Sequence, residues 1–406
     1  MRRGTGASWP ALRRAGLGAL AVGLAGGVVL SVAAPRPPRT PRRVRDVAEL
    51  EAFLQRLVGS GNPPGLSVAV VKDGRLAYGR GFGTADGPHG VAATPETVYH
   101  WWSMTKIATA VAVLQLAERG QLGLDAPVAG YLPWFAVDQR SRSSPAITVR
   151  HLLNHSSGLP DPMPAMIGWV HYDDAGRDQT ELAKQKLARY THLRFAPGSN
   201  AAYSNLNYLL LGAVIEAVSG RTYERYLVEE VLQPLGMRRT EFVYSRALRE
   251  HAAAGSLPVV HYYTPLLPFL LDARALVRER QGRLLWLRRV YLDATPSSGL
   301  IGSAADVARL MLAYLGGGEL DGGRVLSGES VRRMTYEGHV GSHGLGWFVR
   351  RSGGRLHLQH PGGGPGFATI MRLYPEEGLG VVALANGTDL DYDGLADLLG
   401  SMHWQA

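Results

Sequence analysis

One serine and one lysine in this chain have the spacing of a nucleophile and its base. Ser103 and Lys106 lie one helical turn apart at the start of the apolar run 107–116, so their side chains can touch. A lysine takes the proton of a serine hydroxyl only when burial depresses its pKa. The alternative is a serine that caps the helix beside a solvated lysine. Among the four lysines only Lys106 follows a serine at this spacing, which favours catalysis.

Tyr203 and Asn205 form a second candidate pair, in a loop ahead of a helix expected at 207–218. A phenol can relay a proton to a leaving group, and an amide can orient a substrate and a lysine. Taken alone the pair is weak evidence, because Asn205 could equally cap the helix that follows.

A third candidate segment leaves a strand expected at 355–359 and contains His360, Gly362 and Gly363. Glycines allow backbone N–H groups to approach a substrate closely, as an edge strand beside an acyl group requires. The alternative is a glycine-rich turn with a surface histidine, and His339 has the same His-x-Gly spacing.

In chain order these segments resemble the motifs of the serine β-lactamase and penicillin-binding-protein superfamily. The resemblance is to its class C-like group, which includes esterases, D-amino-acid peptidases and LACTB-type proteins. It spans 47–400 and rests on the segments Ser103-Met104-Thr105-Lys106, Tyr203-Ser204-Asn205, His360-Pro361-Gly362, Leu152-Leu153-Asn154-His155-Ser156-Ser157-Gly158-Leu159-Pro160, Ser298-Gly299-Leu300-Ile301-Gly302-Ser303 and Gly344-Leu345-Gly346-Trp347. Their joint occurrence is more specific than any one of them.

The resemblance implies a role for each matched residue. Ser103 would be the acylated nucleophile, Lys106 its general base, and Tyr203 the group that carries the proton to the leaving group and assists the deacylating water. Asn205 would hold the substrate amide or carbonyl.

The third segment would supply the rest of the substrate-binding groups. The N–H groups of Ser103 and Gly363 would form the oxyanion hole. Gly363 belongs to the strand that also carries His360 and Gly362. The substrate is then a small-molecule or peptide acyl donor.

This third segment departs from the β-lactamase and DD-peptidase pattern. Lys-Thr-Gly or Lys-Ser-Gly is usual there, whereas His360 is at most partly charged at pH 7 and Pro361 has no hydroxyl. Losing a charge-assisted hydrogen bond weakens binding of a carboxylate substrate by about one to two orders of magnitude. No equivalent of the acidic loop of class A enzymes is evident. The pattern favours an esterase or peptidase, with weak or absent penicillin hydrolysis.

His151 and His155 have the i,i+4 spacing of a helical zinc pair, but the usual glutamate after the first histidine and a third ligand are missing. The sequence therefore predicts no metal ion, and no cofactor either. A dinucleotide site at 79–83 is disfavoured because that glycine-rich segment lies in a hairpin.

The apolar periodicity predicts strands at both chain ends and helices between them. We expect an α/β (α+β) fold in which a mixed, largely antiparallel sheet from both ends is flanked by helices and carries a helical insertion. The ranges are 65–71, 75–79, 346–350, 355–359, 368–374 and 380–385 for strands, and 46–58, 107–116, 147–153, 180–190, 207–218, 223–231, 304–314 and 392–402 for helices.

The formal charge of +9 over 406 residues belongs to the N-terminal segment. Nine arginines and no acidic residue lie in the first 45 residues, and the remaining 34 basic residues balance the 34 acidic ones, which disfavours a nucleic-acid partner. The basic start and the apolar run 15–34 predict a signal peptide or a signal-anchor helix over 1–34. A Pro/Arg linker, 35–46, would connect it to a domain over 47–406.

The chain has no cysteine, so disulfides, thiolate metal sites and a cysteine nucleophile are excluded. We expect an extracytoplasmic protein, either anchored in the membrane or secreted.

The segment 258–292 is basic and apolar, with six arginines against Asp272 and Glu279. It could rest on an anionic membrane and admit a lipophilic substrate. The alternatives are a helical lid with its arginines in water and an oligomer contact.

These expectations converge on a serine hydrolase that forms an acyl-enzyme at Ser103. The rival hypothesis is a cell-envelope binding or scaffold protein of the same fold that keeps the pocket without turning over. The oligomeric state is open.

Overall fold

The computed structural model describes residues 37–138, 145–261, 264, 267–270 and 272–405. The predicted signal or anchor segment, 1–34, lies outside them. Within the described residues, no helix combines the length and the apolar character needed to cross a membrane.

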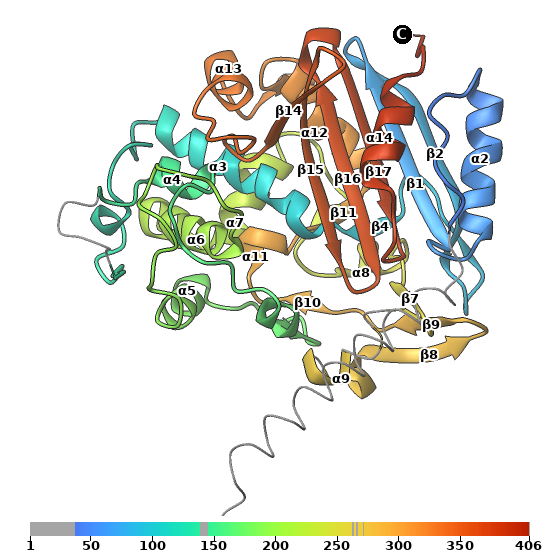
Figure 1. Ribbon diagram of the computed structural model, residues 1–406, viewed down its shortest axis with the longest axis horizontal. Coiled ribbons are helices and arrows are strands. Elements are labelled where there is room, and N and C mark those ends of the chain that lie inside the picture. Colours follow the sequence, from blue (N-terminus) through green and yellow to red (C-terminus); the bar gives the residue numbers. More distant parts are fainter. Residues whose placement is uncertain (1–36, 139–144, 262–263, 265–266, 271, 406) are drawn as a thin grey trace, which may run out of the picture.

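A seven-stranded antiparallel sheet combines both ends of the chain (Figure 1). The strand order is β14-β15-β16-β17-β1-β2-β3, so the last strand of the C-terminal set pairs with the first of the N-terminal set. The bounds are β1 Gly65–Lys72, β2 Arg75–Asp86, β3 Val91–Ala92, β14 Phe348–Ser352, β15 Arg355–Gly364, β16 Phe367–Tyr374 and β17 Leu379–Ala385. The fold-class prediction is confirmed.

Tight turns join neighbouring strands of this sheet. Asp73 and Gly74 both have positive φ, 48° and 81°, which matches the right-handed twist of the two strands that they connect. The turn between β16 and β17 is the 3₁₀ turn Pro375–Glu377, closed by Gly378 with a φ of 56°.

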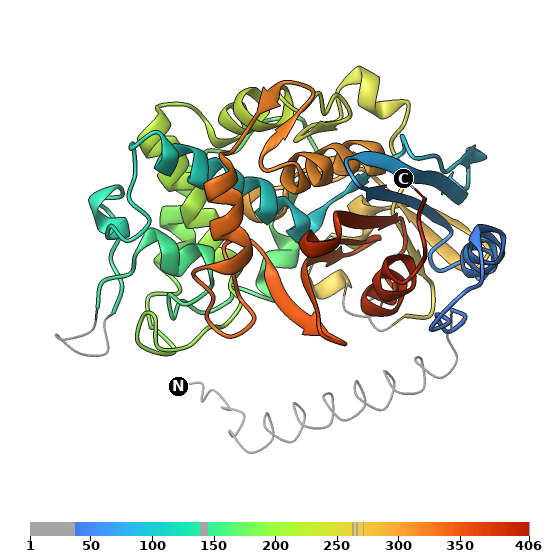
Figure 2. The same ribbon diagram turned by 90° about the horizontal axis from the view of Figure 1, so that it is seen from above.

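The central strands are buried on both faces, and alternate residues belong to different cores. In β17, Val381 and Ala383 pack against α2 (Val47–Gly59) and α14 (Tyr392–Gly400), while Val382 and Leu384 face the larger core. Figure 2 shows the blue α2 and the dark-red α14 on one side of the sheet and the orange α12 (Ala304–Leu315) on the other. The sheet is therefore the middle of three layers.

The middle of the chain forms a helical part beside the sheet, around α3 (Thr105–Glu118). Residues 105–116 of α3 are all buried, as the all-round apolar pattern predicts, and the helix stops at Gly120 with a φ of 67°. The remaining α-helices of the described residues are α4 Val149–Leu153, α5 Gln179–Leu187, α6 Asn205–Ser219, α7 Tyr223–Leu227, α8 Arg246–Arg249, α9 Leu267–Leu270, α10 Ala273–Leu276, α11 Thr295–Ser298 and α13 Gly328–Tyr336.

Short strands complete the fold in four small sheets. Their orders are β10-β5, β4-β11-β6, β12-β13 and β7-β9-β8. The bounds are β4 Val98–His100, β5 Val170–His171, β6 Thr240–Glu241, β7 Ser256–Pro258, β8 Val277–Gln281, β9 Leu284–Leu287, β10 Tyr291–Leu292, β11 Ile301–Ser303, β12 Glu319–Leu320 and β13 Gly323–Arg324.

The helical lid considered for 258–292 is wrong. The segment holds two four-residue helices, α9 and α10, followed by the hairpin β8–β9. Gly282, with a φ of 60°, lies in the two-residue turn of this hairpin, where that conformation is needed. The apolar run at Leu284–Leu287 is therefore a strand.

Two helices illustrate how boundaries differ from the sequence prediction. Thr148 caps α4 by accepting a hydrogen bond from the His151 N–H, so that helix starts at Val149. The helix expected over 223–231 is α-helical only to Leu227 and continues as a π-helical turn, Val228–Leu232.

The side chain of Arg372 on β16 is buried and binds α14 to the sheet. Its guanidinium donates to Gln359 Oε1 at 2.8 Å, to Asp393 at 2.7 Å, and to Asp397. We expect Arg372→Met to lower the free energy of unfolding by about 1–3 kcal/mol, because the charge-assisted hydrogen bonds that hold α14 on the sheet are lost. Urea unfolding measures this change. Arg351→Met, at an exposed position on β14, is the control, and an equal effect of both variants would contradict the assignment.

Candidate active site

Ser103 lies in the 3₁₀ turn Trp102–Met104, directly before α3, and not inside the helix as the spacing alone predicts. Trp102 has a φ of 50°, a conformation that costs a bulky residue about 1–3 kcal/mol. The tertiary structure holds this turn, since Trp101 N–H donates to Leu300 O and Thr369 Oγ1 donates to Trp101 O. The nucleophile candidate is thus fixed between the sheet and α11.

Lys106 is fully buried, and its Nζ has three oxygen neighbours. They are Ser103 Oγ at 3.0 Å, Asn205 Oδ1 at 2.8 Å and the backbone oxygen of Ser297 at 2.8 Å. The last two are carbonyl oxygens, which can only accept. A neutral amine therefore points its two hydrogens at Asn205 and Ser297 and its lone pair at Ser103.

Burial favours this neutral form of Lys106. Desolvation lowers the pKa of Lys106 from 10.5 to about 7, although the carboxylate of Asp161 opposes the shift. A neutral amine is therefore available beside the serine hydroxyl near neutral pH.

Tyr203 lies on the other side of the same hydroxyl. Its hydroxyl donates to Ser103 Oγ at 2.7 Å, and Lys106 Nζ is 5.0 Å from the centre of its ring. Burial raises the pKa of Tyr203, so the phenol stays protonated and can donate. The structure brings Ser103, Lys106, Tyr203 and Asn205 together.

Asp161 is part of this group, and the sequence analysis missed it. Its Oδ1 accepts from both the N–H and the Nδ2 of Asn205, each at 3.0 Å. These bonds turn the amide oxygen of Asn205 toward Lys106, and they place a carboxylate at the N-terminus of α6, where the helix dipole favours it. The sequence feature that could have identified Asp161 is its position directly after Pro160, at the end of a segment that resembles the β-lactamase superfamily.

His360 lies behind Tyr203 and does not line the pocket that contains Ser103. It is 2% exposed, packs on Phe348 and Tyr203, and donates from Nδ1 to Pro361 O at 2.8 Å. Desolvation and then the charge of Lys106 lower the pKa of His360 to about 3. The imidazole is therefore neutral and supports the phenol from behind.

The two glycines of the third segment differ in position. Gly362 is buried on β15, where a Cβ would meet the backbone oxygen of Trp101 at 2.1 Å, so only glycine fits. Gly363 lines the pocket together with Gly364 and Pro365.

The pocket around Ser103 has a volume of about 190 Å³ and walls that are largely apolar. Lys106 lies beneath the floor, and Asp161 is the one charged side chain among the described lining residues. The lining is Trp102, Ser103, Asp161, Met163, Met166, Ile167, Trp169, Tyr203, Asn205, Leu292, Ala294, Ser298, Gly363, Gly364 and Pro365. It suits an apolar acyl donor.

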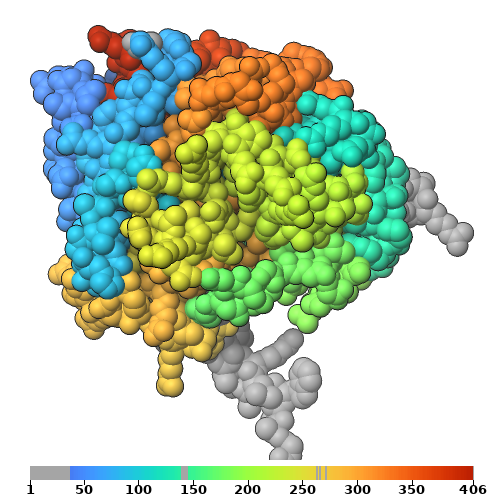
Figure 3. All heavy atoms as spheres, turned by 180° about the vertical axis from the view of Figure 1, so that it is seen from behind, coloured from blue at the N-terminus to red at the C-terminus, as the bar shows by residue number. Residues whose placement is uncertain are grey.

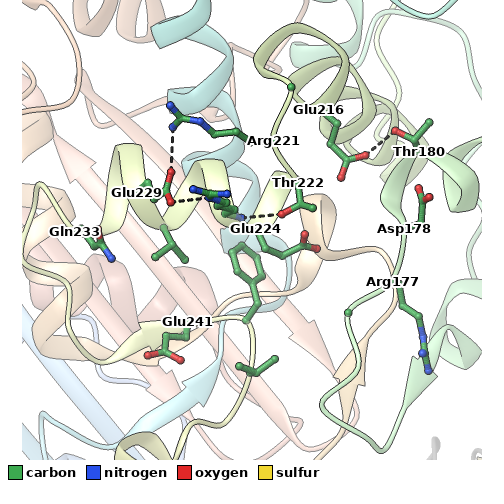
Figure 4. A pocket seen from close by; sticks show the side chains of 16 residues that line it. Arg177, Asp178, Thr180, Glu216, Arg221, Thr222, Glu224, Glu229, Gln233 and Glu241 are labelled. Atoms are coloured by element: carbon green, nitrogen blue, oxygen red, sulfur yellow. Dashed lines mark hydrogen bonds and ion pairs between the residues drawn. The ribbon is translucent and has the colours of Figure 1, made fainter.

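A larger hollow of about 1020 Å³ lies elsewhere, next to α6 and α7 (Figure 4). Ser103 is not among the residues that line it. Figure 4 shows two of its carboxylates bound by neighbouring side chains: Glu229 accepts from Arg221 and Arg225, and Glu216 accepts from Thr180.

His151 and His155, which have the i,i+4 spacing of a helical zinc pair, both form hydrogen bonds within the protein. His151 Nδ1 accepts from Thr148 N–H, and His155 Nδ1 accepts from Ser204 N–H and from Asn207 Nδ2, both at 3.2 Å. The ring of His155 also packs against Tyr203 in a tilted arrangement, with centroids 4.6 Å apart. His155 therefore positions the loop that carries Tyr203.

Comparisons with known proteins agree with this arrangement. The Beta-lactamase family profile matches residues 50–400. Penicillin-binding protein 4* of Bacillus subtilis is 30% identical, over 80% of this chain and 69% of its own length. Protein flp of Staphylococcus aureus is 27% identical over 83% of this chain, which spans only 62% of that relative.

Among solved structures, the octameric penicillin-binding protein homologue from Pyrococcus abyssi superposes with a TM-score of 0.70. It is 27% identical, and the match covers 87% of this chain and 76% of that one. A profile match over most of the chain shows that the chain belongs to the Beta-lactamase family.

Proposed function

We propose that this protein is a serine hydrolase that forms an acyl-enzyme at Ser103. The observation that carries the proposal is the position of the Ser103 hydroxyl, 3.0 Å from Lys106 Nζ and 2.7 Å from the Tyr203 hydroxyl, in an apolar pocket. Membership of the Beta-lactamase family supports it.

In the acylation step, Lys106 accepts the hydroxyl proton while Ser103 Oγ forms a bond to the acyl carbon. The N–H groups of Ser103 and Gly363 are the proposed donors to the oxyanion. The bond to the leaving group then breaks, and the leaving group takes a proton through Tyr203.

Deacylation repeats this sequence with water as the nucleophile. Lys106 accepts the proton of the attacking water as the water oxygen bonds to the acyl carbon. The bond from that carbon to Ser103 Oγ then breaks, and the proton passes from Lys106 through the Tyr203 hydroxyl to Ser103 Oγ. The carboxylic acid product then leaves.

We propose an uncharged ester or amide with an apolar acyl group as the substrate class. Neutral His360 offers no cation to a carboxylate, and Asp161 adds a negative charge to the pocket. Both features disfavour penicillins and other acyl donors that carry a carboxylate.

We also propose that the domain over 47–406 acts outside the cytoplasm. The basic start and apolar run of the sequence, followed by the linker 35–46, support export or anchoring.

Exposure to a fluorophosphonate should add one adduct to the intact protein, detected by mass spectrometry, because the activated hydroxyl attacks phosphorus. Ser103→Ala should abolish the adduct, whereas Ser156→Ala, at a buried serine outside the pocket, should keep it. The absence of any adduct on folded wild-type protein would favour a non-catalytic binding protein.

The pH dependence of kcat/KM for a neutral ester should show one inflection near pH 7. Below it the rate should fall about tenfold per pH unit, because Lys106 becomes protonated, and above it the rate should reach a plateau. His155 and His360 have lowered pKa values and do not compete for this assignment. A rate that still rises between pH 8 and about pH 10, the ordinary lysine range, would contradict a neutral Lys106.

A nitrophenyl ester with a terminal carboxylate should be hydrolysed at least about tenfold more slowly than its neutral analogue. Asp161→Asn should reduce this discrimination, because the charge is lost while an oxygen remains to accept from Asn205. The measurement is the ratio of the two kcat/KM values. Asp173→Asn, at an exposed carboxylate outside the pocket, is the control, and an unchanged ratio in Asp161→Asn would refute the electrostatic explanation.

A further inference from the structure

Three exposed apolar side chains lie at the Ser103 pocket or on elements next to those that line it, and we call them the apolar rim. They are Met163, Tyr172 and Phe269, with exposed fractions of 44%, 41% and 85%. Neither catalysis nor the packing of the described residues explains them.

The contacts of the rim place it at the pocket. Met163 itself lines the pocket. α9, which carries Phe269, packs against the 3₁₀ turn Ala165–Gly168, whose Met166 and Ile167 are also lining residues.

Tyr172, the third residue of the rim, lies next to an element that borders the pocket. It directly follows β5, which pairs with β10, and Leu292 of β10 lines the pocket. Burial, and secondarily the carboxylate of Asp272, raise the pKa of Tyr172. Through β5 and the 3₁₀ turn Ala165–Gly168, the rim connects the elements that line the pocket with α9 and β10.

The segment 258–292 exposes positive charge beside the rim. Its exposed arginines, which we call the arginine face, are Arg274, Arg280, Arg283, Arg288 and Arg289. Figure 1 shows α9, β8 and β9 together along the lower edge of the molecule, and in Figure 3 the yellow-orange residues form the same lower edge from behind.

Nearby carboxylates are already engaged. Asp86 binds Arg278 through two hydrogen bonds of 2.7 and 2.9 Å, and Glu279 also pairs with Arg278. Asp173 and Asp174, next to Tyr172, pair with Arg177 and Arg249. The arginine face has no ion pair among the described residues.

We propose that the apolar rim and the arginine face bind an anionic phospholipid bilayer, with the pocket entrance turned toward it. Exposed aromatic and aliphatic side chains enter the boundary between headgroups and acyl chains, and adjacent arginines bind anionic headgroups. The interaction would give lipophilic acyl donors a direct route to Ser103.

The absence of cysteine allows a direct test on the full chain. Phe269→Cys creates a single labelling position for an environment-sensitive nitrobenzoxadiazole dye, and Tyr336→Cys, 49% exposed on α13 at the opposite end of the molecule, is the matched control (Figure 1). With phosphatidylcholine vesicles that contain phosphatidylglycerol, the dye at 269 should shift to the blue and be quenched by brominated lipids. The dye at 336 should not respond.

Arginine variants test the charge contribution. The side chains of Arg274, Arg283 and Arg288 are exposed, so changing all three to Gln leaves the fold intact. The apparent vesicle affinity reported by the dye at 269 should fall by at least about tenfold. Arg332→Gln combined with Arg333→Gln, on α13, should leave the affinity unchanged.

An equal response of the two dye positions, or an equal response to vesicles of phosphatidylcholine alone, would overturn the proposal. All variants share the same N-terminal segment, so its own affinity for lipid does not produce the difference. The readout needs no turnover and is therefore independent of the proposed hydrolase activity.

Discussion

The proposed chemistry of the site depends on one buried amine. Lys106 Nζ is surrounded by two carbonyl oxygens and one hydroxyl, in a position without access to water. An ammonium group there would lose its hydration, so the neutral amine is favoured, and the two carbonyls then determine where its lone pair points. In the proposed function, the nucleophilicity of Ser103 follows from this arrangement and not from a property of the serine itself.

Three parts of the fold must meet for the amine to be held in this way. α3 carries Lys106, the start of α6 provides the amide of Asn205, and α11 provides the backbone oxygen of Ser297. Asp161 fixes Asn205 with two hydrogen bonds, so the carboxylate that opposes the pKa shift also orients the amide. The sheet adds the end of β15, which extends beyond the pairing of β15 with β14, as the remaining wall of the pocket.

The sequence predicts the parts of this site that depend on local spacing. Ser103 and Lys106 are three residues apart, and the alternating strands of both chain ends show their periodicity directly. Asp161 escaped prediction because its role depends on a contact with Asn205, 44 residues away. The Ser297 oxygen is a backbone atom, which no residue type reveals, and the burial of His360 depends on Phe348 and Tyr203, from other elements. The hairpin β8–β9 was misjudged because short apolar runs fit a helix or a strand equally well.

The most direct test of the central claim is the titration of Lys106 itself. The chain has only four lysines, so nitrogen-15 labelling of their side chains gives four resolvable NMR signals, and Lys106→Arg identifies the one of interest. The neutral-amine account predicts that this signal titrates near pH 7. If the Lys106 signal instead titrates near pH 10, with the ordinary lysine pKa, then the lysine is an ammonium at neutral pH and the account is contradicted.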